Sequence, residues 1–92
     1  MKFSTLSRIV ILEAHRLKEN AGYSGAWNDG GSGHLLGKLD DFKNELVIRE
    51  DLRPSEFHLL NDMEIGEPEV FSDVIKDYKR KLADEIVNKM KL

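Results

Sequence analysis

A stretch of twelve residues, GYSGAWNDGGSG at positions 22–33, limits the folds open to this chain more than any other feature. Five of the twelve residues are glycines, and Asn-Asp-Gly-Gly in the middle is typical of turns, because these residues tolerate left-handed backbone angles. A helix or strand does not continue easily through such a stretch. We therefore expect a glycine-rich loop that separates one structured segment before it from a longer portion after it.

The segment before this loop, residues 4–21, is predicted to be a helix. Its apolar side chains recur at helical spacing: Leu6, Ile9, Val10 and Leu17. Ser4 is a candidate N-cap, because its hydroxyl can accept a hydrogen bond from a first-turn N–H. The β-branched run at residues 9–11 also suits a short strand, but the charged residues that follow it favour a helix.

The segment after the loop, residues 33–49, carries an apolar stripe in steps of three and four. Ser32 is a candidate N-cap for this second helix. Gly37 weakens the helix by about 1 kcal/mol relative to alanine, and a glycine here is compatible with close backbone packing.

Two more helices are predicted in the last third of the chain. A short helix at residues 55–63 follows Pro54, which suits a first helical turn, and Gly66 is expected to end it. A long helix at residues 68–89 begins with Pro68, which suits the first helical position.

These segments predict an all-α fold, with three main helices and one short helix in a single domain over residues 1–92. The helical stripes define a predicted core. Its members are Leu6, Val10, Leu17, Leu36, Leu39, Phe42, Leu46, Phe57, Leu60, Phe71, Ile75, Tyr78, Leu82 and Ile86.

The composition excludes several classes of protein. At 92 residues the chain is too short for a two-lobed enzyme, and without cysteine it has no disulfide scaffold and no thiolate metal site. The apolar run near the N-terminus, residues 9–12, is too short for a signal peptide, and no stretch is long enough for a membrane span. We therefore expect a cytoplasmic protein without a membrane partner.

Charge is distributed unevenly along the chain. The net charge is −3, but residues 40–73 hold eleven acidic and three basic side chains, a balance of 3 − 11 = −8. The portions before and after are mildly basic, at +2 and +3. The acidic centre is either a solvated surface or a surface that selects a basic protein partner, such as a nucleic-acid-binding protein. Direct binding to nucleic acid is not expected from a chain with this charge.

The sequence contains no convincing catalytic or cofactor motif. Residues 31–38, GSGHLLGK, resemble both nucleotide-binding fingerprints, but the glycine spacing fits neither of them. The three histidines lie in different segments without paired metal-ligand spacing, and Asn28-Asp29-Gly30 lacks the remaining ligands of a calcium loop. We therefore predict a non-enzymatic protein that needs no cofactor and no metal.

The favoured function is to bind, and to modulate or inhibit, a protein partner, as small acidic phage-encoded accessory proteins do. Tryptophan and tyrosine among glycine, serine and asparagine are typical of binding loops. The predicted partner-binding residues combine this loop with the acidic centre: Tyr23, Trp27, Asn28, Asp29, His34, Asp40, Asp41 and Glu45.

Two alternative functions remain open at this point. One is a binding protein for a small anion or nucleotide, with Lys38 and His34 near the ligand. The other is a structural homo-oligomer that assembles through the apolar face of residues 70–90.

Overall fold

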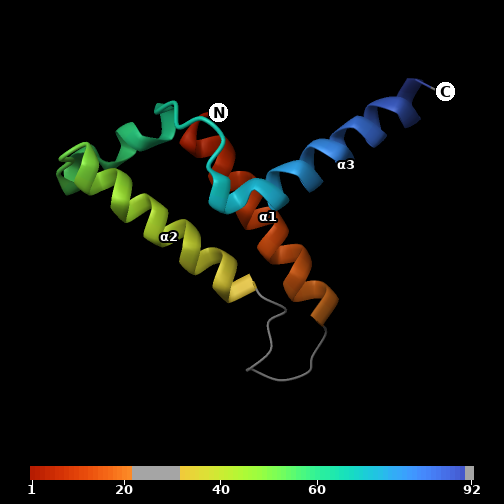
Figure 1. Ribbon diagram of the computed structural model, residues 1–92, viewed down its shortest axis with the longest axis horizontal. Coiled ribbons are helices and arrows are strands. Elements are labelled where there is room, and N and C mark those ends of the chain that lie inside the picture. The colour runs from red at the N-terminus through yellow and green to blue at the C-terminus, as the bar shows by residue number, and fades with distance from the viewer. Residues whose placement is uncertain (22–31, 91–92) are drawn as a thin grey trace.

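A computed structural model describes residues 1–21 and 32–90 of the chain. The described residues form helices without a β-strand, which confirms the all-α prediction. The elements, in chain order, are α1 (Phe3–Ala21), α2 (Ser32–Arg49), the 3₁₀ helices η1 (Pro54–Asp62) and η2 (Glu69–Phe71), and α3 (Ser72–Met90) (Figure 1).

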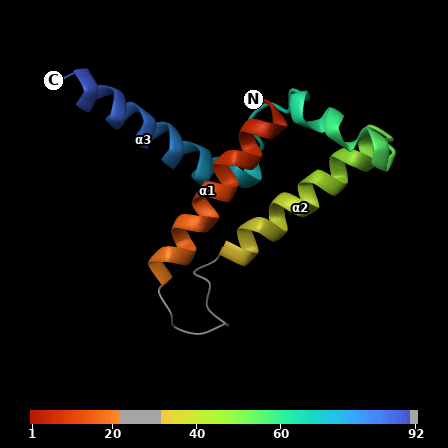
Figure 2. The same ribbon diagram turned by 180° about the vertical axis from the view of Figure 1, so that it is seen from behind.

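Helix α1 is the element on which the others assemble. It contacts α2, η1 and α3, and η1 also contacts α2. Helix α3 crosses α1 close to its own beginning and then runs away from the rest of the chain, as both views show (Figures 1 and 2). The fold therefore has a packed centre and one helix that extends beyond it.

The start of α1 is fixed by the segment that follows η1. The N–H of Phe3 donates to the carbonyl of Met63 at 3.0 Å, and the N–H of Ile65 donates to the carbonyl of Met1 at 2.9 Å. The carbonyl of Lys2 accepts the N–H groups of Thr5 and Leu6, each at 3.1 Å.

Ser4 therefore lies inside the helix, and the prediction that it forms the N-cap is wrong. The backbone pairing with the distant segment at residues 63–65 starts the helix earlier than the local sequence indicates.

Helix α2 ends in a turn whose hydrogen bonds follow the Schellman pattern. The N–H of Leu52 donates to Val47 O at 3.0 Å, and the N–H of Asp51 donates to Ile48 O at 3.2 Å. Asp51 adopts a φ of 51°, the left-handed region that glycine usually occupies at this position. Leu52 and Val47 both pack against the core, as is common in this motif.

Helix η1 begins at Pro54, one residue before the predicted range, and the fixed φ of this proline suits a first turn. The carboxylate of Glu56 accepts the N–H of Arg53 at 3.1 Å, which satisfies a donor just before the helix. The helix ends at Asp62, four residues before Gly66. Gly66 has a φ of +70° and turns the linking segment instead of ending the helix.

The long helix predicted at residues 68–89 is divided in the structure. Pro68 has extended backbone angles and precedes the short helix η2, so its predicted place inside the first turn is wrong. Helix α3 itself begins at Ser72 and ends at Met90.

The core consists of two clusters that share partly buried side chains. One cluster joins α1 to η2 and α3, and the other joins α1 to α2 and η1; their buried members are Leu6, Val10, Phe71 and Ile75, and Phe3, Leu46 and Leu60. Phe42 of α2 connects them, because its ring stacks on Phe3 at 6.3 Å and meets the edge of Phe71 at 6.1 Å.

The predicted core is right at its centre and wrong at its edges. Leu36, Leu82 and Ile86 are exposed, because no neighbouring element among the described residues covers them. Phe3, Ile9 and Ala14 are buried although the predicted core did not include them. The radius of gyration is 15.5 Å, against about 12 Å for a compact chain of this length, so part of the molecule lies outside the packed centre.

Candidate protein-binding surfaces

The predicted partner-binding residues lie in two parts of the chain. Tyr23, Trp27, Asn28 and Asp29 belong to residues 22–31 and lie outside the described residues. His34, Asp40, Asp41 and Glu45 lie on α2 and are all exposed. The structure therefore describes the α2 half of the predicted surface.

The α2 residues occupy two sides of the helix. Spacings of seven and four place His34, Asp41 and Glu45 on one side, because a helix repeats every 3.6 residues. Asp40 lies about 100° away from Asp41 around the helix axis. Asp41 and Glu45 border a hollow with Lys38, Phe42 and Val70, whereas Asp40 borders a larger groove on the other side.

The carboxylates of α2 differ from Asp62 and Glu67, two other members of the acidic centre, in having no ion pair. Asp62 lies 3.8 Å from the Lys2 ammonium, and Glu67 pairs with Lys79 of α3. Within the described part of the chain, no basic side chain comes within ion-pair distance of Asp40, Asp41 or Glu45 (their charges are compensated by solvent alone). Asp62 and Glu67 thus have basic partners within the chain, whereas the three carboxylates of α2 face solvent. Helix α2 also carries Lys38, Lys43 and Arg49, so its formal charge is balanced, 3 − 3 = 0.

The groove beside Asp40 is the largest hollow described, at about 480 Å³. We call it the α1–α2 groove. Its lining comes from α1, α2 and η1: Phe3, Ser7, Ile11, Leu36, Leu39, Asp40, Lys43, Phe57, His58, Leu60 and Asn61. Ile11 and Leu36 are half exposed, at 52% and 42%, so apolar side chains line this groove beside a free carboxylate.

Helix η1 closes one end of the α1–α2 groove. Leu60 is buried against α1 and α2, which anchors η1 to both helices. The ammonium of Lys43 lies 5.8 Å above the ring of Phe57, a cation–π contact that ties α2 to η1. These contacts hold the three walls of the groove in one arrangement.

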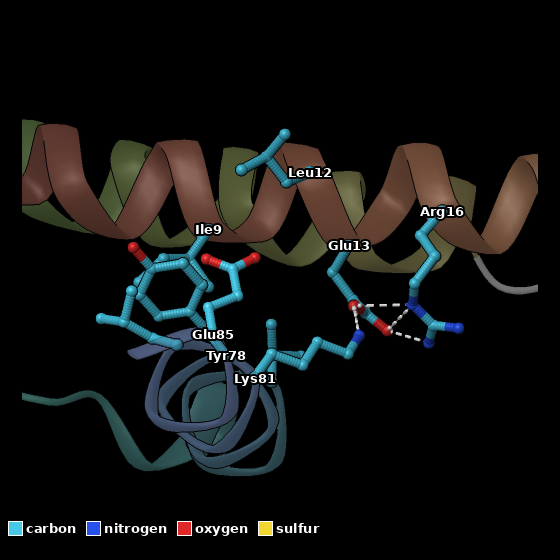
Figure 3. Close-up of a pocket in the computed structure, with 9 residues that line it drawn as sticks. Ile9, Leu12, Glu13, Arg16, Tyr78, Lys81 and Glu85 are labelled. Atoms are coloured by element: carbon cyan, nitrogen blue, oxygen red, sulfur yellow. Dashed lines mark hydrogen bonds and ion pairs between the residues drawn. The ribbon is translucent and has the colours of Figure 1, made fainter. Parts of the chain in front are cut away.

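A second groove, of about 250 Å³, lies between α1 and the part of α3 from Val74 to Glu85 (Figure 3). Glu13 lies at its side, hydrogen-bonded to Arg16 and 3.9 Å from the Lys81 ammonium. The hydrogen bond from Arg16 lowers the pKa of Glu13, and the bond from Lys81 lowers the pKa of Asp77. These charged groups link α1 to α3, and this structural role explains the lowered pKa values.

The potential metal ligands of the described residues do not gather at one place. No group of three potential metal ligands comes together among them, and His15, His34 and His58 lie apart, with His15 paired to Glu19 at 3.1 Å. Lys38, which the anion-binding alternative requires, shares its hollow with Asp41 and Glu45, whose charges oppose an anion. No helix within the described ranges is long and apolar enough to cross a membrane.

The sequence pattern does not reveal the α1–α2 groove, because apolar residues at helical spacing are typical of a core. Ile11 lies beside the main stripe of α1, and Leu36 lies within the stripe of α2, yet both remain half exposed. The signal available in the sequence was an apolar face too wide for a single neighbouring helix to cover. It appears in the run Ile9–Leu12, where four consecutive apolar residues point to all sides of the helix.

Comparison with protein-family models, with curated proteins and with solved structures finds no match to this chain. The function is therefore inferred from the geometry and charge of these surfaces.

Proposed function

We propose that this protein is a non-enzymatic interaction module that binds a basic, amphipathic segment of a protein partner. The observation that carries the proposal is the pairing of the α1–α2 groove with the free carboxylates of α2. Apolar side chains of the partner would enter the groove beside Ile11 and Leu36. A lysine or arginine side chain of the partner would face Asp40 at the edge of the groove. Basic side chains that extend over α2 would face Asp41 and Glu45 on its other side.

The α1–α2 groove and the carboxylates of α2 contribute to binding in different ways. Burial of apolar side chains in the groove supplies most of the affinity, at about 25 cal/mol per Å² of apolar area. Exposed carboxylates add little affinity in salt, but they raise the association rate and exclude acidic partners. The proposed segment therefore needs both an apolar face and a basic face.

A modulatory role is the favoured consequence of such binding. A small module that covers a basic surface of a nucleic-acid-binding protein competes with the phosphates that this surface would otherwise contact. We extend the proposal to cytoplasmic inhibition of such a partner, in the manner of phage-encoded accessory proteins.

The proposal is tested by affinity capture from bacterial lysate with two charge-matched triple variants. The test variant neutralises the free carboxylates of α2: Asp40→Asn, Asp41→Asn and Glu45→Gln. The control neutralises three exposed acids elsewhere: Glu19→Gln, Asp73→Asn and Asp84→Asn. We expect the wild type and the control to retain the same partner and the test variant to lose it, with capture weakening as salt rises.

Leu36→Glu tests the apolar half of the proposal. Leu36 is exposed in the groove, so the substitution is expected to abolish capture without lowering the unfolding temperature. Equal capture by wild type, the α2 triple variant and Leu36→Glu would contradict the proposal.

Trp27→Ala tests the loop that the sequence adds to this surface. We expect it to weaken capture more than it weakens folding, because tryptophan is enriched at the centres of interfaces. Loss of folding instead would remove Trp27 from the proposed binding surface.

A further inference from the structure

The second half of α3 forms an arm that the packed centre does not cover. We define this arm as residues 82–90, where every residue is exposed. Both ribbon views show it extending away from α2 and η1 (Figures 1 and 2). Leu82 and Glu85 in its first turn still line the groove with α1, and the residues beyond them extend past it. The large radius of gyration has the same origin, since a helix of nine residues adds about 13 Å of length.

One face of the arm is apolar throughout. Its members recur at helical spacing: Leu82, Ala83, Ile86, Val87 and Met90. Ile86 and Met90 are 53% and 80% exposed, far more than Phe71 and Ile75 at the base of the same stripe, which are fully buried. A contiguous apolar face left open on a small protein indicates an interaction surface.

The charges beside this face are complementary to a reversed copy of themselves. Glu85 and Lys89 are four residues apart and therefore lie along the same side of the arm. A second copy that runs antiparallel, related by a two-fold axis, places its Lys89 beside Glu85 and its Glu85 beside Lys89. A parallel copy instead brings Glu85 to the level of Glu85 and Lys89 to the level of Lys89, where like charges repel.

We infer that the arm pairs with the arm of a second copy of this chain to form an antiparallel homodimer. Two acidic residues and one basic residue leave the arm with little net charge, which does not favour a strongly charged foreign partner. The two packed centres lie at opposite ends of such a dimer and do not obstruct one another. The surface buried by two short arms falls below the usual size of a stable interface, so the dimer is weak and concentration-dependent.

Sedimentation velocity from about 1 µM to about 1 mM, a range that spans weak association, measures this equilibrium. We expect a monomer at the low end and a dimer at the high end. Ile86→Glu is expected to weaken dimerisation at least about tenfold, because it places a charge in the centre of the apolar face. Ile48→Glu is the matched control, since Ile48 is 79% exposed on α2 and lies outside the arm.

Charge exchange tests the antiparallel direction independently of the apolar face. Glu85→Lys alone and Lys89→Glu alone each place like charges together in an antiparallel dimer and are expected to weaken it. An equimolar mixture of the two variants restores opposite charges at both contacts and is expected to dimerise at least as well as the wild type.

Three outcomes would overturn the inference. The first is a monomer at every concentration, which would leave the arm to a different partner. The second is an equal effect of Ile86→Glu and Ile48→Glu. The third is a mixture of the two charge variants that stays as weakly associated as each variant alone.

Discussion

The two halves of α3 have similar sequence patterns and opposite surroundings. In the first half, Ile75 continues the stripe that Phe71 of η2 begins, and both side chains are buried against α1. In the second half, Leu82 and Ile86 continue the same stripe and remain exposed. Both halves are helical, so the apolar pattern specifies the helix and not what covers it. Coverage depends on where α3 crosses α1, which a local pattern does not encode.

The most direct test of this contrast removes one apolar side chain from the buried start of the stripe, Phe71 of η2, and one from the exposed half of α3. Phe71→Ala is expected to lower the free energy of unfolding by about 3–5 kcal/mol, because the ring is fully buried and contacts Phe42. Ile86→Ala is expected to change it by less than about 0.5 kcal/mol in dilute solution. Urea unfolding at low protein concentration measures both.

Similar losses from the two substitutions would mean that the arm is packed in solution. The matched pair also separates core packing from helix propensity, since both variants introduce the same residue and alanine favours helices.

A smaller change in the free energy of unfolding is expected from substitutions of glycine, which act on the backbone and not on a buried side chain. A Cβ at Gly37 meets nothing within 4 Å, so Gly37→Ala should stabilise the protein by about 0.5–1 kcal/mol. The prediction of close backbone packing at this glycine is therefore wrong.

Gly66 also has open space around it, but its φ of +70° strains any other residue. Gly66→Ala should destabilise by about 1 kcal/mol, and thermal unfolding would show shifts of opposite sign.

The smallest expected effect concerns the ion pairs between the packed centre and the base of α3. Hydrogen bonds from basic partners lower the pKa values of Glu13, Glu67 and Asp77 in the folded state. The unfolded chain therefore binds more protons than the folded chain at acidic pH. Their stabilisation is fully present above the ordinary carboxyl pKa and is lost as pH falls through the lowered values.

Thermal unfolding between pH 7 and pH 3 should therefore show a falling midpoint below about pH 5. Glu13→Gln serves as the matched variant: it should be slightly less stable than wild type at pH 7 and equally stable at pH 3. The effect is modest because exposed pairs are screened by solvent and salt. A midpoint that rises on acidification would contradict this role for the carboxylates.

Much of the fold could be predicted from the sequence, because local signals determine it. The glycine-rich stretch separates α1 from α2, helical spacing identifies the three long helices, and Pro54 begins η1. The predictions are wrong where contacts between segments distant in the sequence determine where a helix begins. Backbone pairing with residues 63–65 moves the start of α1 ahead of Ser4, and the segment before α3 forms η2 as a separate turn.

The sequence predicts the acidic residues of the candidate site but not the shape of its groove. The acidic centre is evident in the sequence, but only the fold shows which carboxylates find partners within the chain. Lys2 of the N-terminal segment pairs with Asp62, and Lys79 of α3 pairs with Glu67. Among the described residues, the carboxylates of α2 have no such ion pair. The α1–α2 groove requires three elements to meet, and no single helix pattern contains it.

The contrast between the halves of α3 is tested most directly by amide hydrogen exchange at two protein concentrations. In dilute solution, residues 72–78 should exchange with protection close to that of the core of α1, while residues 82–90 exchange rapidly, as expected for an exposed helix end. At high concentration, the arm alone should gain protection as copies pair. Strong protection of the whole of α3 in dilute solution would contradict an uncovered arm, and an arm that stays unprotected at high concentration would contradict its pairing.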